Sequence, residues 1–207
     1  MIKLGKIILI VVSMLAVSAG MMANETADGI LKRATKAIKT ADGLVASFTM
    51  TYGNQEVSGT MKSSGRKFSL VTSATSVWYD GKTLWTYNKK NNETTVTLPT
   101  VAEVAEANPM QIVNAYSDNF TAAFAKSQKK GSKTIVLTPK SKKIGYKSVH
   151  LTIPDKSSFP TQMVVVPSNG QKITISVTGV KTGQKFSANT FTYPAARYPK
   201  AEIVDLR

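Results

Sequence analysis

The feature that most constrains the fold of this chain is an alternation of apolar and polar residues with a period of two. Every second residue from Leu44 to Tyr52 is apolar, and three of the four residues between them are serine or threonine. Because successive side chains of a strand point to opposite faces of a sheet, this pattern predicts a strand with one apolar face. Turn signals such as Gly53-Asn54 and Asp80-Gly81 separate similar segments, which predicts an antiparallel meander. Its six strands are expected near residues 44–52, 57–61, 68–70, 77–79, 83–87 and 94–98.

A helical pattern then interrupts the strands. Apolar residues recur at helical spacing from Val101 to Val113, and Asn108-Pro109 separates two short helices. We expect Phe120 and Phe124 to extend this helical region, so that the insertion spans about residues 100–124. Strands resume near residues 134–138, 147–153, 161–166, 171–180 and 189–193, which brings the expected total to about eleven.

The order of these elements predicts a mainly β protein with an N-terminal helix and a helical insertion. An amphipathic helix over Thr26–Lys39 precedes the first strand. A long sheet that rolls up has an apolar inner face, and a helical insertion midway along the chain is well placed to cover it. Periodicity alone leaves an ordinary β-sandwich without a cavity as the alternative. No repeat or linker divides residues 24–207, so we expect one domain there.

The first residues have the pattern of a secretory signal peptide. Lys3 and Lys6 precede an apolar run over Ile7–Val17, and the small residues Ser18-Ala19-Gly20 follow it. The run has about eleven residues, against the roughly 20 that a membrane-spanning helix needs. We therefore expect cleavage between residues 19 and 23 and a soluble periplasmic protein, with a retained membrane anchor as the alternative.

Composition narrows the classes of partner. The chain has 27 basic and 12 acidic residues, and removal of the leader with its two lysines leaves a net charge of +13. Such an excess favours anionic surroundings, such as membrane phosphates or acidic protein surfaces, although it can also serve solubility alone. Because the chain is exported and its basic residues are scattered, we expect no nucleic-acid partner. The absence of cysteine excludes disulfides and thiolate metal sites.

The residues that catalysis needs are scarce. His150 is the only histidine, and it lies within an expected strand, where a lone histidine is usually structural. Glu103 and Glu106 are the nearest approach to an acidic cluster, but on a helix they are typical of solvated side chains. We therefore expect no enzyme activity, metal or cofactor. An unrecognised hydrolase, dependent on His150 or on an acid, is the alternative.

Particular residues, beyond the pattern, resemble a known family. The segment from Asp80 to Asn88, DGKTLWTYN, is similar to a turn and strand of the outer-membrane lipoprotein carrier proteins, the LolA family. Weaker similarities follow in the family's order and span nearly all of the chain after the leader. They lie at Ala46–Thr49, at Asn108-Pro109 with Met110–Val113, at Val136–Lys140, at Phe191–Pro194 and at Ile203–Asp205.

The resemblance implies an incomplete, unclosed antiparallel β-barrel with an N-terminal helix and a helical lid. It also implies a carrier that accepts acylated lipoproteins from an inner-membrane exporter and passes them to an outer-membrane acceptor or membrane; we expect a monomer. An arginine that latches the lid in the family aligns with Gly65 here, so the adjacent Arg66 is the candidate latch. A sensor or scaffold that binds lipid or protein without transport is the alternative, because one fold serves many functions.

The cargo-binding residues are chosen for apolar, adaptable side chains on the strands and the lid. Met110 and Val113 are expected to face the cavity and to stabilise a closed lid outside the strand ladder. The predicted cavity residues are Phe48, Met50, Met61, Phe68, Leu70, Trp85 and Tyr87, and the predicted lid residues are Met110, Ile112 and Val113. Met163 is a further methionine suited to this role, although for each methionine a core position is the simpler interpretation.

Overall fold

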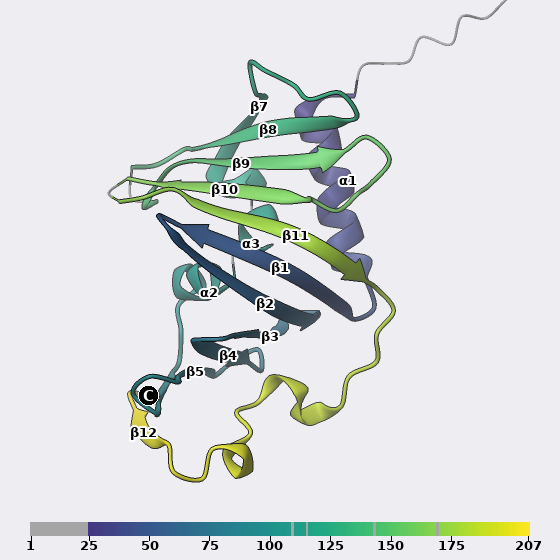
Figure 1. Cartoon of the computed structure of the whole chain (residues 1–207). Coiled ribbons are helices and arrows are strands. Elements are labelled where there is room, and N and C mark those ends of the chain that lie inside the picture. Colours follow the sequence, from purple (N-terminus) through teal and green to yellow (C-terminus); the bar gives the residue numbers. More distant parts are fainter. Residues whose placement is uncertain (1–24, 109, 115, 143, 169) are drawn as a thin grey trace, which may run out of the picture.

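A computed structural model describes residues 25–207 except 109, 115, 143 and 169. The expected signal peptide lies outside the described residues. All twelve strands of the described chain form one sheet, in the order β12-β6-β5-β4-β3-β2-β1-β11-β10-β9-β8-β7. The end strands β7 and β12 do not pair with each other, so the sheet is open (Figure 1). The predicted mainly β, unclosed architecture is confirmed.

The first half of the sheet is the meander that the alternation predicts. Its strands are β1 (Leu44–Tyr52), β2 (Gln55–Ser64), β3 (Lys67–Thr72), β4 (Thr75–Tyr79), β5 (Leu84–Asn88) and β6 (Glu93–Thr97). Gly53 and Gly65 have φ of 57° in their tight turns, a value that favours glycine. At the next hairpin the Asp80 carboxylate accepts hydrogen bonds from the backbone N–H groups of Lys82 and Thr83.

The second half is a further antiparallel run that returns to the first strand. It consists of β7 (Phe120–Phe124), β8 (Ser132–Pro139), β9 (Tyr146–Pro154), β10 (Gln162–Pro167) and β11 (Ile173–Lys181). β11 pairs with β1, with a bulge between Ser47 and Phe48, so the two runs join at the centre of the sheet. β12 (Glu202–Asp205) then pairs in parallel with β6 at the far edge.

Two segments differ from the sequence prediction. Phe120 and Phe124, expected in a helix, begin and end β7, because this segment pairs in register with β8, for example Ala122 with Leu137. The expected strand 189–193 is instead the short 3-10 helix η1 (Ala188–Phe191). Phe191 is buried there, and its ring packs edge-on against Phe186. This segment is therefore held by side-chain packing rather than by the hydrogen bonds of a strand pair. A second short 3-10 helix, η2 (Ala195–Arg197), leads to β12.

The helices lie behind the sheet as Figure 1 is drawn. They are α1 (Ala27–Thr40), α2 (Val101–Ala107), α3 (Met110–Asn114) and α4 (Tyr116–Asn119). α1 begins at its cap Thr26, whose hydroxyl accepts a hydrogen bond from Gly29 N–H (3.0 Å). Its buried residues Ile30 and Leu31 pack with α3 and with the apolar side chains of β8, β9 and β10, and we call this group the main core. We call the face of the sheet that the helices cover the inner face.

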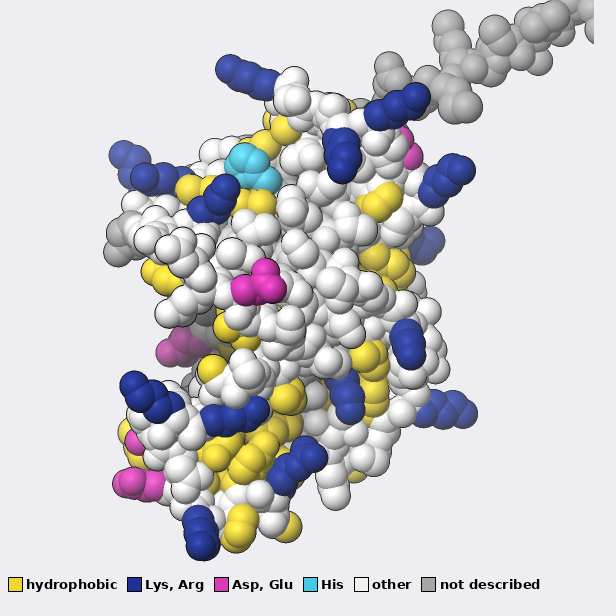
Figure 2. Space-filling view, in the orientation of Figure 1, with side chains coloured by type: hydrophobic (Ala, Val, Ile, Leu, Met, Phe, Trp, Pro, Cys, Tyr) yellow, Lys and Arg dark blue, Asp and Glu magenta, His cyan; other side chains and the backbone are white. Residues whose placement is uncertain are grey.

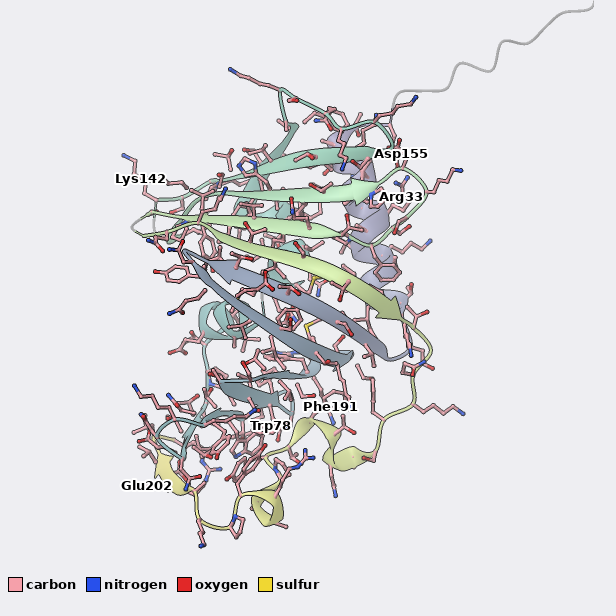
Figure 3. The ribbon with its side chains drawn as sticks, viewed as in Figure 1. Arg33, Trp78, Lys142, Asp155, Phe191 and Glu202 are labelled. Carbon is pink, nitrogen blue, oxygen red and sulfur yellow. The ribbon has the colours of Figure 1, made fainter. Side chains whose placement is uncertain are left out.

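The opposite, outer face is polar over the centre of the sheet. Threonine and serine side chains pair across its strands, as Thr134 does with Thr152 and Thr49 with Ser58. Figure 2 shows this face mostly white, with apolar side chains gathered near the C-terminal segment, residues 186–201. That segment covers the outer side of β4–β6, where the rings of Tyr193 and Tyr198 pack edge-on against Trp78 (Figure 3).

Candidate functional site

The predicted cavity residues of the first three strands come together on the inner face. One row of directly paired residues crosses β1 to β4: Ala46, Met61, Leu70 and Val77. Phe48 and Met61 are buried, and the half-buried Met50 and Leu70 pack against them. Phe68 is fully buried in the adjoining group with Val77, Tyr79 and Leu84, and Leu70 contacts both groups. We call this continuous apolar surface of β1–β5 the inner patch.

Gly59 makes room for the largest side chain of the inner patch. It lies directly opposite Phe48, and a Cβ atom built on Gly59 would be 2.5 Å from the tip of the Phe48 ring. It would also be 2.7 Å from the backbone oxygen of Val71. Any side chain at position 59 would therefore have to displace both groups. The glycine lets the Phe48 ring lie flat along the neighbouring strand, which keeps the patch continuous between β1 and β2.

α2 covers part of the inner patch, and its N-terminus is stabilised by a cap formed from its own residues. Thr100 and Glu103 form a capping box, in which Thr100 N–H donates to the Glu103 carboxylate (2.7 Å) and Glu103 N–H to the Thr100 hydroxyl (3.3 Å). Hydrogen bonds from Thr100 hold the pKa of Glu103 below its ordinary value. Val104 and Ala107 pack on the patch but are only half-buried, and Val101 is 84% exposed. The cover of the patch is therefore thin.

α3 and α4 are fixed to α1 rather than to the inner patch. Ile112 and Val113 lie in the main core, and Val113 is fully buried. Thr35 donates a hydrogen bond to the Val113 backbone oxygen (2.9 Å). The structure therefore places Val113, predicted as a lid residue, in the main core rather than against the inner patch. Met110 of α3, half-buried, contacts both the main core and the inner patch, as Ile175 of β11 also does.

A buried tyrosine makes a second link between these helices. The Tyr116 hydroxyl donates to the Asp28 carboxylate (2.8 Å) in the first turn of α1. Burial, and then this hydrogen bond, raises the pKa of Tyr116 to about 12. Lys32 and then Tyr116 lower the pKa of Asp28. The predicted insertion 100–124 thus consists of a thin cover, α2, an anchored pair, α3 and α4, and the strand β7.

Trp85 and Tyr87 lie on the outer face, away from the inner patch. Trp85 is directly opposite Trp78, whose ring packs on the C-terminal segment, whereas Leu84 packs inward. The Tyr87 ring is 4.2 Å from the Tyr198 ring. Strand alternation correctly places Trp85 and Tyr87 on one shared face, but the structure separates that face from the other predicted cavity residues.

Some residues of the inner patch were missed in the sequence. Phe159, in the loop between β9 and β10, packs against the patch, and its backbone N–H is held by the Ser157 hydroxyl (3.0 Å). The sequence offered one signal for Phe159, since it is an apolar residue that follows two serines and precedes a proline. Met163 is buried in the main core rather than in the patch. Leu44, Val77 and Leu84 follow from the alternation but were not singled out.

The described residues contain no constellation typical of catalysis or of metal binding. His150 lies on the outer face, with Nε2 3.0 Å from the Ser148 hydroxyl. No group of three or more His, Cys, Asp or Glu residues in the described part of the chain could hold a metal ion. Within residues 25–207, masked positions aside, no helix is long and apolar enough to cross a membrane. The inner patch is therefore the strongest candidate for a binding site.

Comparison with known families agrees with this arrangement. The family model described as "Outer membrane lipoprotein carrier protein LolA" matches residues 40–194, which include all of the inner patch and its cover. The chain belongs to the LolA family. A search of curated proteins gives no significant match.

Solved structures show the LolA-like fold in distant proteins. An uncharacterized conserved protein from Thermus thermophilus aligns with a TM-score of 0.60 and 14% identity, over 86% of this chain and 98% of that one. A DUF1329 family protein from Desulfovibrio piger aligns with a TM-score of 0.50 and 10% identity, over 83% and 99% of the two chains. MucB aligns with a TM-score of 0.49 and 12% identity, over 86% and 65%. At these identities the first two alignments show the fold alone, and the MucB alignment carries no further conclusion.

The lid latch expected from the LolA resemblance remains a prediction. Arg66 is exposed in the turn between β2 and β3, and no hydrogen bond or ion pair joins it to the described residues of α2, α3 or α4. The neighbouring Gly65, where the family places its arginine, has φ of 57°. An arginine at this position would be strained, because only glycine adopts such a φ at little cost.

Proposed function

We propose that this LolA-family protein binds the acyl chains of lipoproteins on the inner patch and carries them across the periplasm. The observation that carries the proposal is the continuous apolar surface from Phe48 to Leu84, covered by a helix whose described side chains are half-buried or exposed. Acyl chains could enter between α2 and the strands without disrupting the main core. The half-buried Met50 and Met110 are flexible enough to repack around chains of varied shape.

The energetics of transfer support a carrier that delivers by direct contact. Each methylene group moved from water to an apolar site is worth about 0.8 kcal/mol, so several acyl chains represent tens of kcal/mol. Release into water is therefore excluded, and the patch should bind only moderately so that exchange with the next acceptor is nearly balanced. We propose an inner-membrane exporter as the donor and an outer-membrane protein or membrane as the acceptor.

We also propose that the protein catalyses no reaction. His150 is on the outer face of the sheet, on the opposite side from the inner patch, and its ring contacts a serine hydroxyl. It cannot reach a chain bound beneath α2 without leaving its strand. The alternative, a sensor or scaffold that binds without transport, shares the binding step and differs in the next one, because a carrier passes its ligand to an acceptor and a sensor does not.

Two neighbouring residues of β3 provide the sharpest test of the site. Leu70 points to the inner patch, and Val71 points to the outer face, where it is 42% exposed. We expect Leu70→Gln to weaken binding of a fluorescent fatty acid about tenfold or more, because a polar group would lie unpaired among apolar chains. Val71→Gln is the matched control and should bind as the wild type does.

Fluorescence titration of both variants, with circular dichroism to confirm their fold, gives the answer. Equal binding by the wild type and by a folded Leu70→Gln variant would contradict the proposed site. If binding follows the prediction, transfer of a loaded, acylated lipoprotein to acceptor vesicles separates a carrier from a sensor.

A further inference from the structure

The two edges of the open sheet differ in how well they are protected from pairing with another strand. β12, at one edge, has the sequence EIVD, so two of its four residues are acidic. β7, at the other edge, has the sequence FTAAF, without a charge or a proline. Exposed edge strands of natural proteins usually carry charges or proline that prevent pairing with other chains. β7 lacks both, and Phe124 at its end is 42% exposed.

The register of β7 determines which of its backbone groups face outward. Lys140 N–H donates to the Asn119 backbone oxygen (2.9 Å), and Ala125 N–H donates to the Thr134 backbone oxygen (2.9 Å). In an antiparallel pair of strands, only every second residue forms hydrogen bonds to the neighbouring strand. Residues 119 and 125 bond toward β8, so the odd-numbered residues of β7 between them do so as well. Ala122 and Phe124 therefore direct their N–H and C=O groups away from β8, toward the open edge, whereas the N–H of Phe120 closes the last turn of α4.

The end of this edge is rigid and adjoins a pocket. The Gln128 side chain accepts a hydrogen bond from Thr134 N–H (2.7 Å) and donates to the Ala125 backbone oxygen (2.8 Å), which fixes the loop after β7. Beside it is a pocket of about 360 Å³ with Ile30, Phe124 and Ile153 among its apolar walls. Four charged residues also line it: Glu25, Arg33, Lys133 and Asp155. Arg33 is paired with Glu25 (2.6 Å), and Figure 3 shows Arg33 and Asp155 close together.

The charge around the edge selects the kind of strand that it would accept. From residue 118 to residue 140 the chain has one acid, Asp118, and five lysines, Lys126, Lys129, Lys130, Lys133 and Lys140. A second copy of this chain would bring the same lysines against them, so charge disfavours self-pairing. An acidic segment would be attracted.

From the edge, the pocket and the charge together, we infer that β7 is a docking site for an extended acidic segment of a partner protein. The segment would add to the sheet as a thirteenth strand, through backbone hydrogen bonds to Ala122 and Phe124, and an apolar side chain at its end would enter the pocket. This interaction surface is separate from the inner patch, so it does not depend on acyl binding.

The test uses a short labelled peptide in which valine and glutamate alternate, with fluorescence anisotropy as the measurement. Ala122→Pro removes an outward N–H without breaking the ladder to β8, and proline is tolerated at such edge positions. We expect this variant to bind the peptide about tenfold more weakly. Lys130→Glu should also weaken binding at low ionic strength, whereas Lys62→Glu, on the distant strand β2, is the control for overall charge.

Two modified peptides keep the test valid if Ala122→Pro does not fold. One is N-methylated at its valines and the other at its glutamates, and only the peptide methylated on the edge that faces β7 should lose affinity for the wild type. Equal binding of both and of the parent peptide would overturn strand addition. If a peptide of alternating valine and lysine binds equally well, the proposal of an acidic partner is overturned. If the wild type forms a dimer that Ala122→Pro abolishes, the strand that docks on β7 belongs to a second copy of this chain.

Discussion

α2 and α3 lie side by side in the sequence but are held by different forces. α3 is packed into the main core, tied to α1 through Thr35, and includes the fully buried Val113. α2 has capping hydrogen bonds at its ends, and the described side chains that it presents to the sheet, such as Val104, are half-buried. The comparison teaches that a helical insertion need not move as one lid. In this protein the anchored part positions the cover, and α2 lies over the inner patch together with Met110 at the start of α3.

The largest expected effect is a difference in the free energy of unfolding between variants of α3 and of α2. Val113→Asp would place an unpaired charge in a packed core, and we expect it to lower the free energy of unfolding by about 4 kcal/mol or more. Val104→Asp can turn its carboxylate to solvent and should cost about 1 kcal/mol. Urea unfolding followed by circular dichroism measures both. Similar losses for the two variants would mean that α2 and α3 are held equally.

A smaller effect tests the anchor of α4 through its dependence on pH. The pKa of Tyr116 is raised from 10.0 to about 12, so the folded protein favours the protonated phenol. Its contribution to stability is therefore fully present below pH 10 and is lost as the pH rises through about 12. We expect the wild type to exceed Tyr116→Phe in stability by about 1 kcal/mol at neutral pH, and this advantage to vanish at high pH.

Urea unfolding of both proteins across this alkaline range gives the comparison. Tyr52→Phe makes the same substitution at a tyrosine that is 45% exposed, and it should match the wild type at each pH. A Tyr116→Phe variant as stable as the wild type at neutral pH would show that the hydrogen bond to Asp28 does not anchor α4.

The fold was largely predictable because its strands alternate cleanly, and the failures have physical causes. Phe120 and Phe124 are four residues apart, a spacing that fits a helix as well as a strand, and only pairing with β8 decides between them. β12 has four residues, too few for a clear period, and depends on its parallel partner β6.

The candidate site was predictable only in part, because alternation assigns residues to shared faces but does not say which face is inner. Met61 and Leu70 share the inner face, and the polar neighbours Thr60 and Ser69 on the other face make this alternation clear in the sequence. Around Trp85 both faces of the sheet are covered, the outer one by the C-terminal segment, so the sequence carries apolar residues on both sides. That covering comes from residues more than 100 positions away in the chain.

The most direct test of the inner patch is to find which side chains an acyl chain touches. A fatty acid with a photoreactive diazirine on its tail would be bound to the mature protein, irradiated, and the labelled residues located by mass spectrometry. We predict label on Met50, Leu70 and Val104, and none on Val113 or Trp85. Label confined to Trp85 and the outer face, or to the main core around Val113, would contradict the account.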